Sequence, residues 1–444
     1  MQILILYSEN ARITGTVSDH LLAFKSFSKH NIVMLDSWSA SGMDIDLDRF
    51  DAVVFHYSII LSSEKFIGDI LREKLSSYRG VKILFIQDEM RFVDSTVKSI
   101  KDIGVSCVFT VVPEDRIRNI YSDPYFDHVV FAPTLTGYVP ESLLDLPVPD
   151  YAQRAVDVSY RARRLSAWYG YFGQEKWKIG ERFAADAGAF GLKCDISTRE
   201  ADRIYGEKWI SFLSNSKAVL GTESGASFID YSGEIAPRVE AYETAHPDAG
   251  FDEIARLFLE GRDGRSEIRA ISPRCFEAAA LKTMMIMYEG GYSGVLEAGR
   301  HYAVLDRDHG NMKEVVEILR SPKRAGEIIH AAHEEIASSG KWSLRAFVGE
   351  FDRTVDAACT ANSAERKPDI AAGEVHELEQ ISRKKAAFHK KKFHLALFLH
   401  RIWHWLIGKL DDRKGKRRPG WARVIINFVE QRIRPALRKL LLGR

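Results

Sequence analysis

Short apolar segments alternate with amphipathic helical patterns along the first 140 residues of this chain. Helical patterns such as 18–28, 63–75 and 94–103 lie between most of the apolar segments. The apolar segments are Gln2–Tyr7, Asn31–Leu35, Ala52–Tyr57, Val81–Gln87, Ser106–Val111 and His128–Phe131. Strands that are apolar throughout and separated by helices are typical of a parallel sheet covered on both faces. The alternation therefore predicts a doubly wound α/β unit at the N-terminus.

A second unit of the same kind follows a segment with four prolines between residues 133 and 151. Its predicted strands are 156–160, 218–221 and 283–288, and its predicted helices are 175–187, 312–319, 324–338 and 343–358, with a largely helical insertion over 232–264. The predicted domains are a first lobe over 1–140, a linker over 141–155, a second lobe over 156–358, a linker over 361–380 and a tail over 381–444. Two such lobes enclose a cleft, and ligands bind at the carboxyl ends of the strands.

Charge is distributed unevenly along the 444 residues. From residue 380 onwards there are 19 Lys and Arg residues against 3 Asp and Glu, a net charge of +16, so the preceding part carries −14 of the total of +2. The four cysteines are far apart and show no metal-binding spacing, which indicates a reducing cytoplasm and argues against a zinc site or disulfide framework. We expect no signal peptide and no transmembrane helix, because the N-terminus lacks a basic region and the chain has no uncharged segment of 18 residues.

The segment most informative about function lies between residues 271 and 306. A predicted helix carrying Arg274 and Glu277 precedes an apolar strand, a glycine-containing loop and a second helix. This order points backbone N–H groups at one position and favours an anion there. The predicted anion site consists of Gly290, Gly291, Tyr292 and Ser293, although two glycines after a strand also suit a simple tight turn. The Glu277 carboxylate in an apolar helix needs a partner, which a ribose diol or Arg274 would supply.

Basic residues follow the first predicted strand of the second lobe. Arg161, Arg163 and Arg164 come directly after that strand, and Lys176 lies in the sequence GQEK. A diphosphate leaving group develops negative charge, which fixed guanidinium and ammonium groups stabilise without a metal ion. We select Arg161 and Lys176 for this role, and the alternative is a solvated basic turn. No metal site is predicted, because no DxD pair lies suitably at a strand end.

Catalytic candidates lie at the ends of other strands. Gly15, which follows the first strand and borders the cleft, is predicted to bind the ligand rather than to act as a catalyst. His56 and Asp88 lie near strand ends, where either could act as a general base, although a single histidine there is more often structural. Glu223, in VLGTESGAS, and Glu289 are predicted to contact ligand hydroxyls in the same cleft. The absence of GxGxxG after the first strand argues against a nicotinamide-dependent dehydrogenase.

The segment from Val156 to Phe351 resembles the nucleotide-sugar-binding half of bacterial glycosyltransferases of the GT-B fold, the group 1 type that makes surface polysaccharide. The matching sequences are YRARR, GQEK, RIYGEKW, LGTESGAS, ISPRCFEAAA, YEGGYSGVLEAGRHY and DHGNMKEVVEIL. The resemblance implies that Glu277 holds the ribose of the donor and that Arg161 and Lys176 hold its diphosphate. It also implies two Rossmann-like lobes and transfer with retention of configuration.

One position departs from the family pattern. Many members carry a second glutamate eight residues before Glu277, where this chain has Arg269, and Glu223 is the predicted replacement. The resemblance implies a hexosyltransferase that moves a sugar from a nucleotide-sugar to a glycan or lipid-linked acceptor, without a metal ion or cofactor. Two alternatives stay open: a catalytically silent scaffold in a membrane-associated polysaccharide assembly, and a sugar-nucleotide epimerase.

The basic tail contains two apolar blocks, 393–410 and 421–442. The second block separates into a polar and an apolar face on a helix, and the first carries Trp403 and Trp405. Basic flanks, tryptophans and an apolar face suit an anionic membrane surface, although such helices could also pack on the acidic body or on a partner chain. We predict a cytoplasmic protein bound peripherally to the membrane. We predict no nucleic acid partner, because the basic residues alternate with aliphatic rather than stacking side chains.

Overall fold

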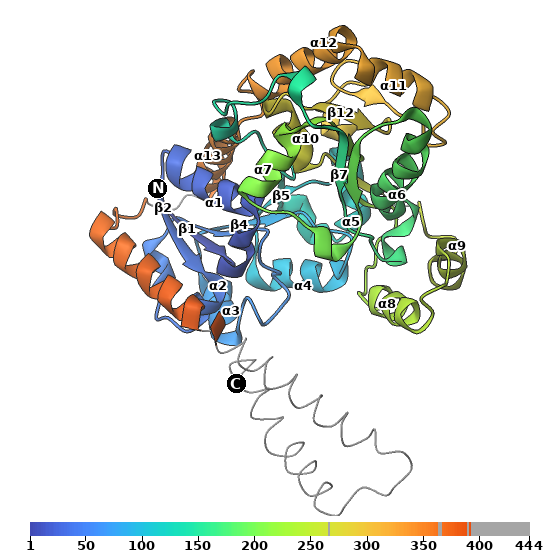
Figure 1. The fold of residues 1–444 in the computed structure, drawn as a ribbon. Helices are drawn as coiled ribbons and strands as arrows, with labels where there is room; N and C mark the ends of the chain where they lie inside the picture. The colour runs from blue at the N-terminus through green and yellow to red at the C-terminus, as the bar shows by residue number, and fades with distance from the viewer. Residues whose placement is uncertain (265–266, 363–365, 389, 392–444) are drawn as a thin grey trace, which may run out of the picture.

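The computed structural model of the protein describes residues 1–264, 267–362, 366–388 and 390–391. Within them the chain forms two lobes, each built on a parallel sheet with helices on both faces (Figure 1). The predicted fold class, two Rossmann-like lobes arranged as in GT-B proteins, is confirmed for the two lobes. The predicted amphipathic helices of the tail fall in residues 392–444, outside the described ones.

The first lobe contains a six-stranded sheet in the order β2-β1-β3-β4-β5-β6, with every neighbouring pair parallel. Its strands are β1 (Gln2–Tyr7), β2 (Asn31–Asp36), β3 (Ala52–Phe55), β4 (Val81–Ile86), β5 (Cys107–Thr110) and β6 (Val130–Pro133). Its helices are α1 (Gly15–Phe27), α2 (Ser37–Ser41), α3 (Asp69–Ser77), α4 (Val93–Ile103) and α5 (Ile117–Ile120). Every residue of β1 is buried, because Leu4 and Leu6 pack into one core and Ile3 and Ile5 into the core on the opposite face.

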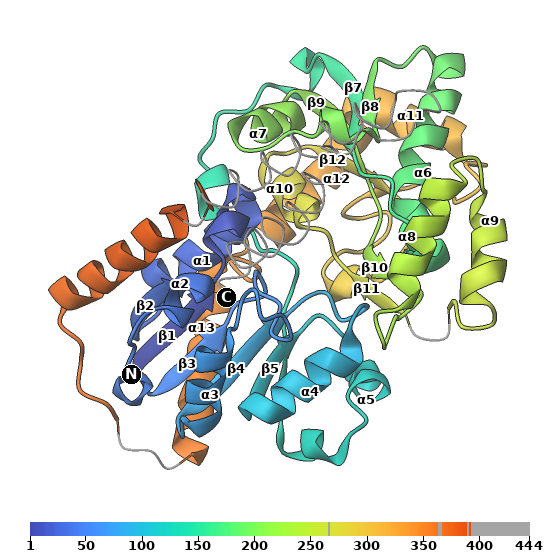
Figure 2. The same ribbon diagram turned by 90° about the horizontal axis from the view of Figure 1, so that it is seen from below.

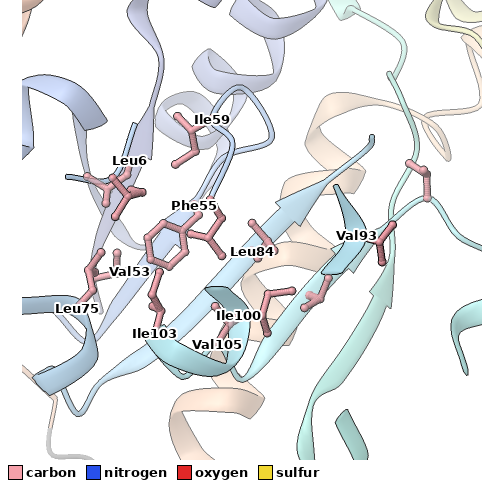
Figure 3. Close-up of a cluster of buried hydrophobic side chains, with 14 of the residues drawn as sticks. Leu6, Val53, Phe55, Ile59, Leu75, Leu84, Val93, Ile100, Ile103 and Val105 are labelled. Atoms are coloured by element: carbon pink, nitrogen blue, oxygen red, sulfur yellow. The ribbon is translucent and has the colours of Figure 1, made fainter. Parts of the chain in front are cut away.

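One of these cores fixes the ends of β3 and β4 (Figure 3). Leu75 of α3 and Ile100 of α4 pack there with Phe55 of β3 and Leu84 of β4, all with at most 2% of their surface exposed. Close packing of this kind leaves the strands little freedom to shift. The loops that follow β3 and β4, which border the space between the lobes, therefore start from rigid positions.

The second lobe contains a five-stranded parallel sheet in the order β13-β12-β9-β7-β8. Its strands are β7 (Val156–Arg161), β8 (Cys194–Ser197), β9 (Ser216–Gly221), β12 (Met284–Met287) and β13 (Ala303–Val304), and β10 (Ser224–Ala226) pairs separately with β11 (Ile268–Ala270). Its helices are α6 (Gly170–Ala187), α7 (Glu207–Ser214), α10 (Pro273–Ala280), α11 (Met312–Arg320) and α12 (Pro322–Ala332). The predicted helical insertion is present as α8 (Ile235–Ala245) and α9 (Phe251–Ile254), at the edge of the lobe (Figure 2).

The helix α13 (Leu344–Ala361) packs on the first lobe, although the predicted second lobe extends to residue 358. Phe347 and Phe351 are buried in the core that also holds Ile3 and Phe24. Figure 2 shows α13 beside the N-terminal sheet. The predicted domain boundary is corrected, because the apolar stripe of this helix completes the face of the sheet that α1 begins to cover.

A further helix over residues 372–388 also packs on the first lobe, where the sequence predicted a linker over 361–380. Its Glu379 accepts a hydrogen bond from the backbone N–H of Met34 in β2 at 2.9 Å. Because β2 is the edge strand, this contact satisfies a backbone donor that the sheet leaves unpaired. The linker prediction is wrong for this part, since a polar composition concealed apolar anchors such as the buried Val375. No helix in the described ranges is long and apolar enough to cross a membrane.

Candidate functional site

A cleft of about 580 Å³ lies between the two lobes. The first lobe contributes the start of α1, and the segment between the lobes contributes residues 140–143. The second lobe contributes the end of β7, the middle of α6, the start of α10 and residues 203–210. The predicted site residues that line it are Gly15, Arg161, Lys176, Arg274 and Glu277. The cleft thus lies where a ligand of an open α/β sheet is expected, at the carboxyl end of a strand and beside helix N-termini.

Basic side chains dominate the lining of this cleft. They are Arg161, Arg163, Lys176, Arg199, Arg203 and Arg274, against Asp19 and Glu277. Arg199 and Arg203 are neutralised locally, at 2.7 Å from Asp202 and 2.9 Å from Glu200. Arg163, in contrast, forms no hydrogen bond or ion pair with another residue of the described ranges. The cleft therefore keeps a positive potential that attracts an anionic ligand.

The pKa of Lys176 in the cleft is strongly lowered. Its Nζ donates to Ser224 Oγ at 3.2 Å. Burial, together with the positive charges of Arg274 and Arg163, lowers the pKa of Lys176 to about 8, against the opposing effect of Asp88. A dianionic group placed beside it would restore the charged form, so Lys176 is electrostatically suited to a phosphate.

Arg161 and Arg274 differ in how many of their donors are already used. Arg161 donates to the Asp195 carboxylate at 2.7 Å, and to the backbone oxygens of Asp195, Tyr160 and Asp202 at 2.9, 3.0 and 3.1 Å. Arg274 donates to the backbone oxygens of Arg161 and Leu220 at 2.5 and 3.4 Å and lies over the ring of Tyr160, and its Nε is buried without a hydrogen-bond partner among the described residues. Arg161 is thus committed to holding loops, whereas Arg274 keeps unused donor capacity.

Glu277 lies on α10 with its carboxylate beside the cleft. Its Oε2 accepts a hydrogen bond from Trp209 Nε1 at 2.8 Å. Burial raises the pKa of Glu277, while the Trp209 hydrogen bond and the charge of Arg274 act in the opposite direction and Asp19 of α1 raises it further. No ion pair joins Glu277 to Arg274 in the described structure, so the pairing considered as an alternative does not occupy this carboxylate. One oxygen is held by an indole and the other is available to a ligand hydroxyl.

The predicted anion site over residues 290–293 is filled from within the protein. Glu223 Oε1 accepts the backbone N–H of Tyr292 at 2.8 Å, and a Cβ on Gly290 would lie only 2.6 Å from Glu223 Oε2. Arg269 Nη1 lies 3.4 Å from the same oxygen. The loop does not line the cleft. The Glu223 carboxylate occupies the position of the predicted anion and accepts the N–H group that an anionic ligand would need. Arg269 thus neutralises the carboxylate that was predicted to replace the family glutamate.

Glu289 and His56 also lie away from the cleft lining. The Glu289 side chain is exposed, while His56 is fully buried. His56 Nε2 lies 3.0 Å from His20 Nδ1, and its Nδ1 accepts the backbone N–H of Ser58 at 3.0 Å. Burial lowers the pKa of both rings, to about 3 for His20, so the pair is neutral at physiological pH. In this structure His56 contacts protein groups on both nitrogens.

Asp88 follows β4 and borders a second cavity, of about 240 Å³. Burial raises the pKa of Asp88, and the charge of Lys176 acts against this rise. No described residue donates a hydrogen bond to its carboxylate. Asp88 is therefore the catalytic candidate that combines an unused carboxylate with electrostatic coupling to the cleft.

The cleft residues that were not selected from the sequence include Arg163, Asp19 and Trp209. Arg163 could have been predicted from the sequence. It lies two positions after Arg161, and side chains two positions apart lie on the same side of an extended chain. Trp209 lies in RIYGEKW, a segment with no assigned role. Nothing in the sequence indicates Asp19, because only the fold brings α1 towards α10. Among the described residues, no group of three or more His, Cys, Asp and Glu side chains could hold a metal ion.

No protein-family model matches this sequence, and no curated protein does. Similar solved structures include an α-glucosyltransferase in complex with UDP, 9% identical, covering 80% of this chain and 100% of that chain, with a TM-score of 0.48. HepE from Anabaena in complex with UDP is 9% identical over 80% of this chain and 100% of that chain, with a TM-score of 0.47. An α-glucosyltransferase in complex with UDP-glucose and DNA containing an abasic site is 9% identical over 81% of this chain and 99% of that chain, with a TM-score of 0.48.

The prediction that nucleic acid is not a partner is corrected. Two of the similar structures are α-glucosyltransferases with DNA in the complex. The exclusion was wrong because it rested on the residue pattern of the tail alone, whereas a fold leaves the choice of acceptor to the side chains of its cleft.

Proposed function

We propose that the protein is a glycosyltransferase that moves a sugar, of the hexosyl type, from a nucleotide-diphosphate sugar to an acceptor hydroxyl across the cleft between the lobes. The observation that carries the proposal is the pair Lys176 and Arg274. Neither cation forms an ion pair with a described residue, and both face the side of the cleft that holds Glu277. A diphosphate would satisfy the two cations, and the ribose next to it would give the free oxygen of Glu277 a donor.

The same residues suit the chemistry of sugar transfer. An acceptor oxygen forms a bond to C1 of the sugar while the bond between C1 and the diphosphate oxygen breaks, and the electron pair stays on the diphosphate. Lys176, Arg274 and Arg163 stabilise this developing charge, which supports transfer without a metal ion. The proton of the acceptor passes to a base of the first lobe, for which Asp88 has the unused carboxylate. Retention of configuration, which is carried into the proposal from the family resemblance, requires the acceptor oxygen to attack C1 from the same face that the diphosphate leaves.

The two alternatives are not favoured. A scaffold that has lost turnover has no need for cations held partly buried without a counter-charge, which costs stability unless a ligand compensates. An epimerase needs no second cavity beside the reacting centre.

A role in surface-polysaccharide synthesis and peripheral attachment to a membrane through residues 392–444, outside the described ranges, remain predictions from the sequence.

Calorimetric titration with UDP, GDP, CMP and dTDP tests the donor site. We expect one of them to bind the wild type, and the substitution Lys176→Met to weaken that binding. Lys178→Met is the matched control, because Lys178 lies two residues further along α6, is exposed and does not line the cleft. If no nucleotide binds, or if both substitutions have the same effect, the proposal is wrong.

A further inference from the structure

The second cavity, of about 240 Å³, is enclosed by side chains from both lobes. The first lobe contributes the loops after β3 and β4, and the second lobe contributes Trp168 and Tyr169 from the turn before α6. Of the 15 residues that line it, 11 are aliphatic or aromatic, and the other four are Gln87, Asp88, Arg91 and Thr96. We call this space the aromatic cavity, because Tyr57, Phe85, Phe92, Trp168 and Tyr169 supply rings to its wall.

The walls of the aromatic cavity are held in place. The rings of Trp168 and Tyr169 stack at 3.9 Å, and Trp168 Nε1 donates to Glu240 at 3.2 Å. Across the cavity, the backbone oxygen of Asp230, just before the helical insertion, accepts the N–H of Phe92 at 3.1 Å and so holds the loop that carries Arg91 and Phe92. This hydrogen bond joins the two lobes. The cavity is therefore preformed rather than a gap that side chains would fill by relaxing.

Two charged residues, Arg91 and Asp88, border this cavity, and Arg91 Nη1 lies 3.8 Å from a carboxylate oxygen of Glu240. Arg91 Nε is buried without a hydrogen-bond partner in the described ranges, although its guanidinium lies over the rings of Phe92 and Trp168 at 4.7 and 5.4 Å. The Asp88 side chain is exposed, and its carboxylate receives no hydrogen bond from a described residue. An unpaired buried donor such as Arg91 Nε, beside an apolar wall, is costly unless a ligand supplies the acceptor. The cavity thus offers a few polar groups, among them the Asp88 carboxylate, and flat apolar surfaces.

The aromatic cavity lies near the donor cleft, because Trp168 lines the cavity and Leu165, three residues earlier in the segment after β7, lines the cleft. Asp88 on the wall of the cavity and Lys176 on the wall of the cleft also influence each other's pKa. A hydroxyl that meets Asp88 therefore lies within electrostatic range of the group that we propose holds the diphosphate. The aromatic cavity is consequently in position to present an acceptor rather than to serve a separate purpose.

We propose that the aromatic cavity is the acceptor subsite, and that it takes a planar group of one or two aromatic rings whose hydroxyl substituent meets Asp88. This inference rests on the proposed glycosyltransferase function. An apolar cavity of about 150 Å³ holds benzene, so the observed 240 Å³ suits a one- or two-ring group. A sugar ring would bury several hydroxyls against walls with few polar partners. An aliphatic chain has no planar face to stack on the five aromatic rings of the wall.

In the transfer step the Asp88 carboxylate accepts the proton of the acceptor hydroxyl. The acceptor oxygen bonds to C1 of the sugar, and the diphosphate departs with the electron pair beside Lys176. Each bond formed is matched by one broken, and no oxidant or other reactant is needed.

Ligand-observed NMR and calorimetry with 2-naphthylmethanol test the proposal, with 1-hexanol and methyl glucoside as the aliphatic and sugar comparisons. We expect the naphthyl compound alone to bind to the full chain. Ile60 lines the cavity and is 50% exposed, so Ile60→Trp should fill the cavity and weaken this binding at least tenfold. The control is Ile70→Trp, because Ile70 is 66% exposed on α3 and lines neither cavity.

Nucleotide binding, measured in parallel, separates this inference from the proposed function. Retained nucleotide affinity in Ile60→Trp shows that the variant is folded. If a nucleotide binds but 2-naphthylmethanol does not, or if 1-hexanol or methyl glucoside binds equally well, the acceptor assignment is overturned while the donor site stands. Unchanged naphthyl affinity in Ile60→Trp overturns it as well. If no nucleotide binds at all, the proposed function itself fails.

Discussion

Raising the pH from 7 to 9 should weaken the binding of a nucleoside diphosphate by up to about tenfold. Burial and neighbouring positive charges lower the pKa of Lys176 to about 8 in the free protein. The ammonium form, which attracts a diphosphate, therefore makes up roughly nine-tenths of the molecules at pH 7 and roughly one-tenth at pH 9. If the charged form alone binds, the change corresponds to about 1.4 kcal/mol. Affinity is fully present below the pKa of Lys176 and is lost as the pH rises through it.

Calorimetric titration at pH 7, 8 and 9 measures this dependence in the wild type, in Lys176→Met and in Lys178→Met. We expect Lys176→Met to bind weakly and with no further loss between pH 7 and pH 9, whereas Lys178→Met should follow the wild type. The comparison with Lys176→Met removes any contribution from ionisation of the nucleotide. A wild-type affinity that stays constant over this range, or a loss that persists in Lys176→Met, would refute the role of Lys176.

Three further predictions concern the cleft, the core and the tail. Glu277→Ala should weaken nucleotide binding about ten- to hundredfold, because hydrogen bonds to charged groups contribute about 1.5–3 kcal/mol. Pyrophosphate, which has no ribose, should bind the variant as it binds the wild type. An equal loss of affinity for both ligands in titrations would contradict the ribose assignment. Phe351→Ala should reduce the free energy of unfolding in urea by about 3–5 kcal/mol, since Phe351 is fully buried against the first lobe, and a loss below about 1 kcal/mol would place α13 elsewhere. Removing residues 392–444 should abolish binding to anionic vesicles and keep nucleotide binding. Removing everything after residue 370 should also lower Tm, because it exposes β2. If the variant that lacks only residues 392–444 still binds vesicles, the membrane prediction is wrong.

The lobes could be predicted from the sequence because their signal is local. A parallel strand buried on both faces is apolar at every position, as β1 is, and this pattern does not depend on distant partners. The helix α13 shows where such reasoning stops. Its apolar stripe was visible, but the sheet against which Phe351 packs is fixed by the path of the chain between the lobes, which periodicity does not encode.

The residues of the candidate site also fall into those that the sequence could predict and those that depend on tertiary contacts. Lys176 and Glu277 were selected because each residue type suits a diphosphate or a ribose, and the fold brings them to one cleft together with Arg274. Arg161 has the same chemistry, yet its donors are used by Asp195 and nearby backbone oxygens, which depends on a strand distant in sequence. The glycine loop after β12 misled for a similar reason: the anion that it favours is the protein's own Glu223. Residue type and spacing thus indicated which groups could act, and tertiary contacts decided which remain available.

Incubation with UDP-, GDP-, CMP- and dTDP-sugars in the presence of aromatic alcohols, with the released nucleotide measured by chromatography, tests the central claim most directly. We predict that the wild-type chain converts one nucleotide-sugar into free nucleotide and a glycosylated alcohol in equal amounts, and that Lys176→Met does so at a greatly reduced rate while Lys178→Met retains the activity. If no nucleotide-sugar is consumed by the wild type, or if the Lys176→Met variant is as active as the wild type, the cleft between the lobes is not the site of sugar transfer.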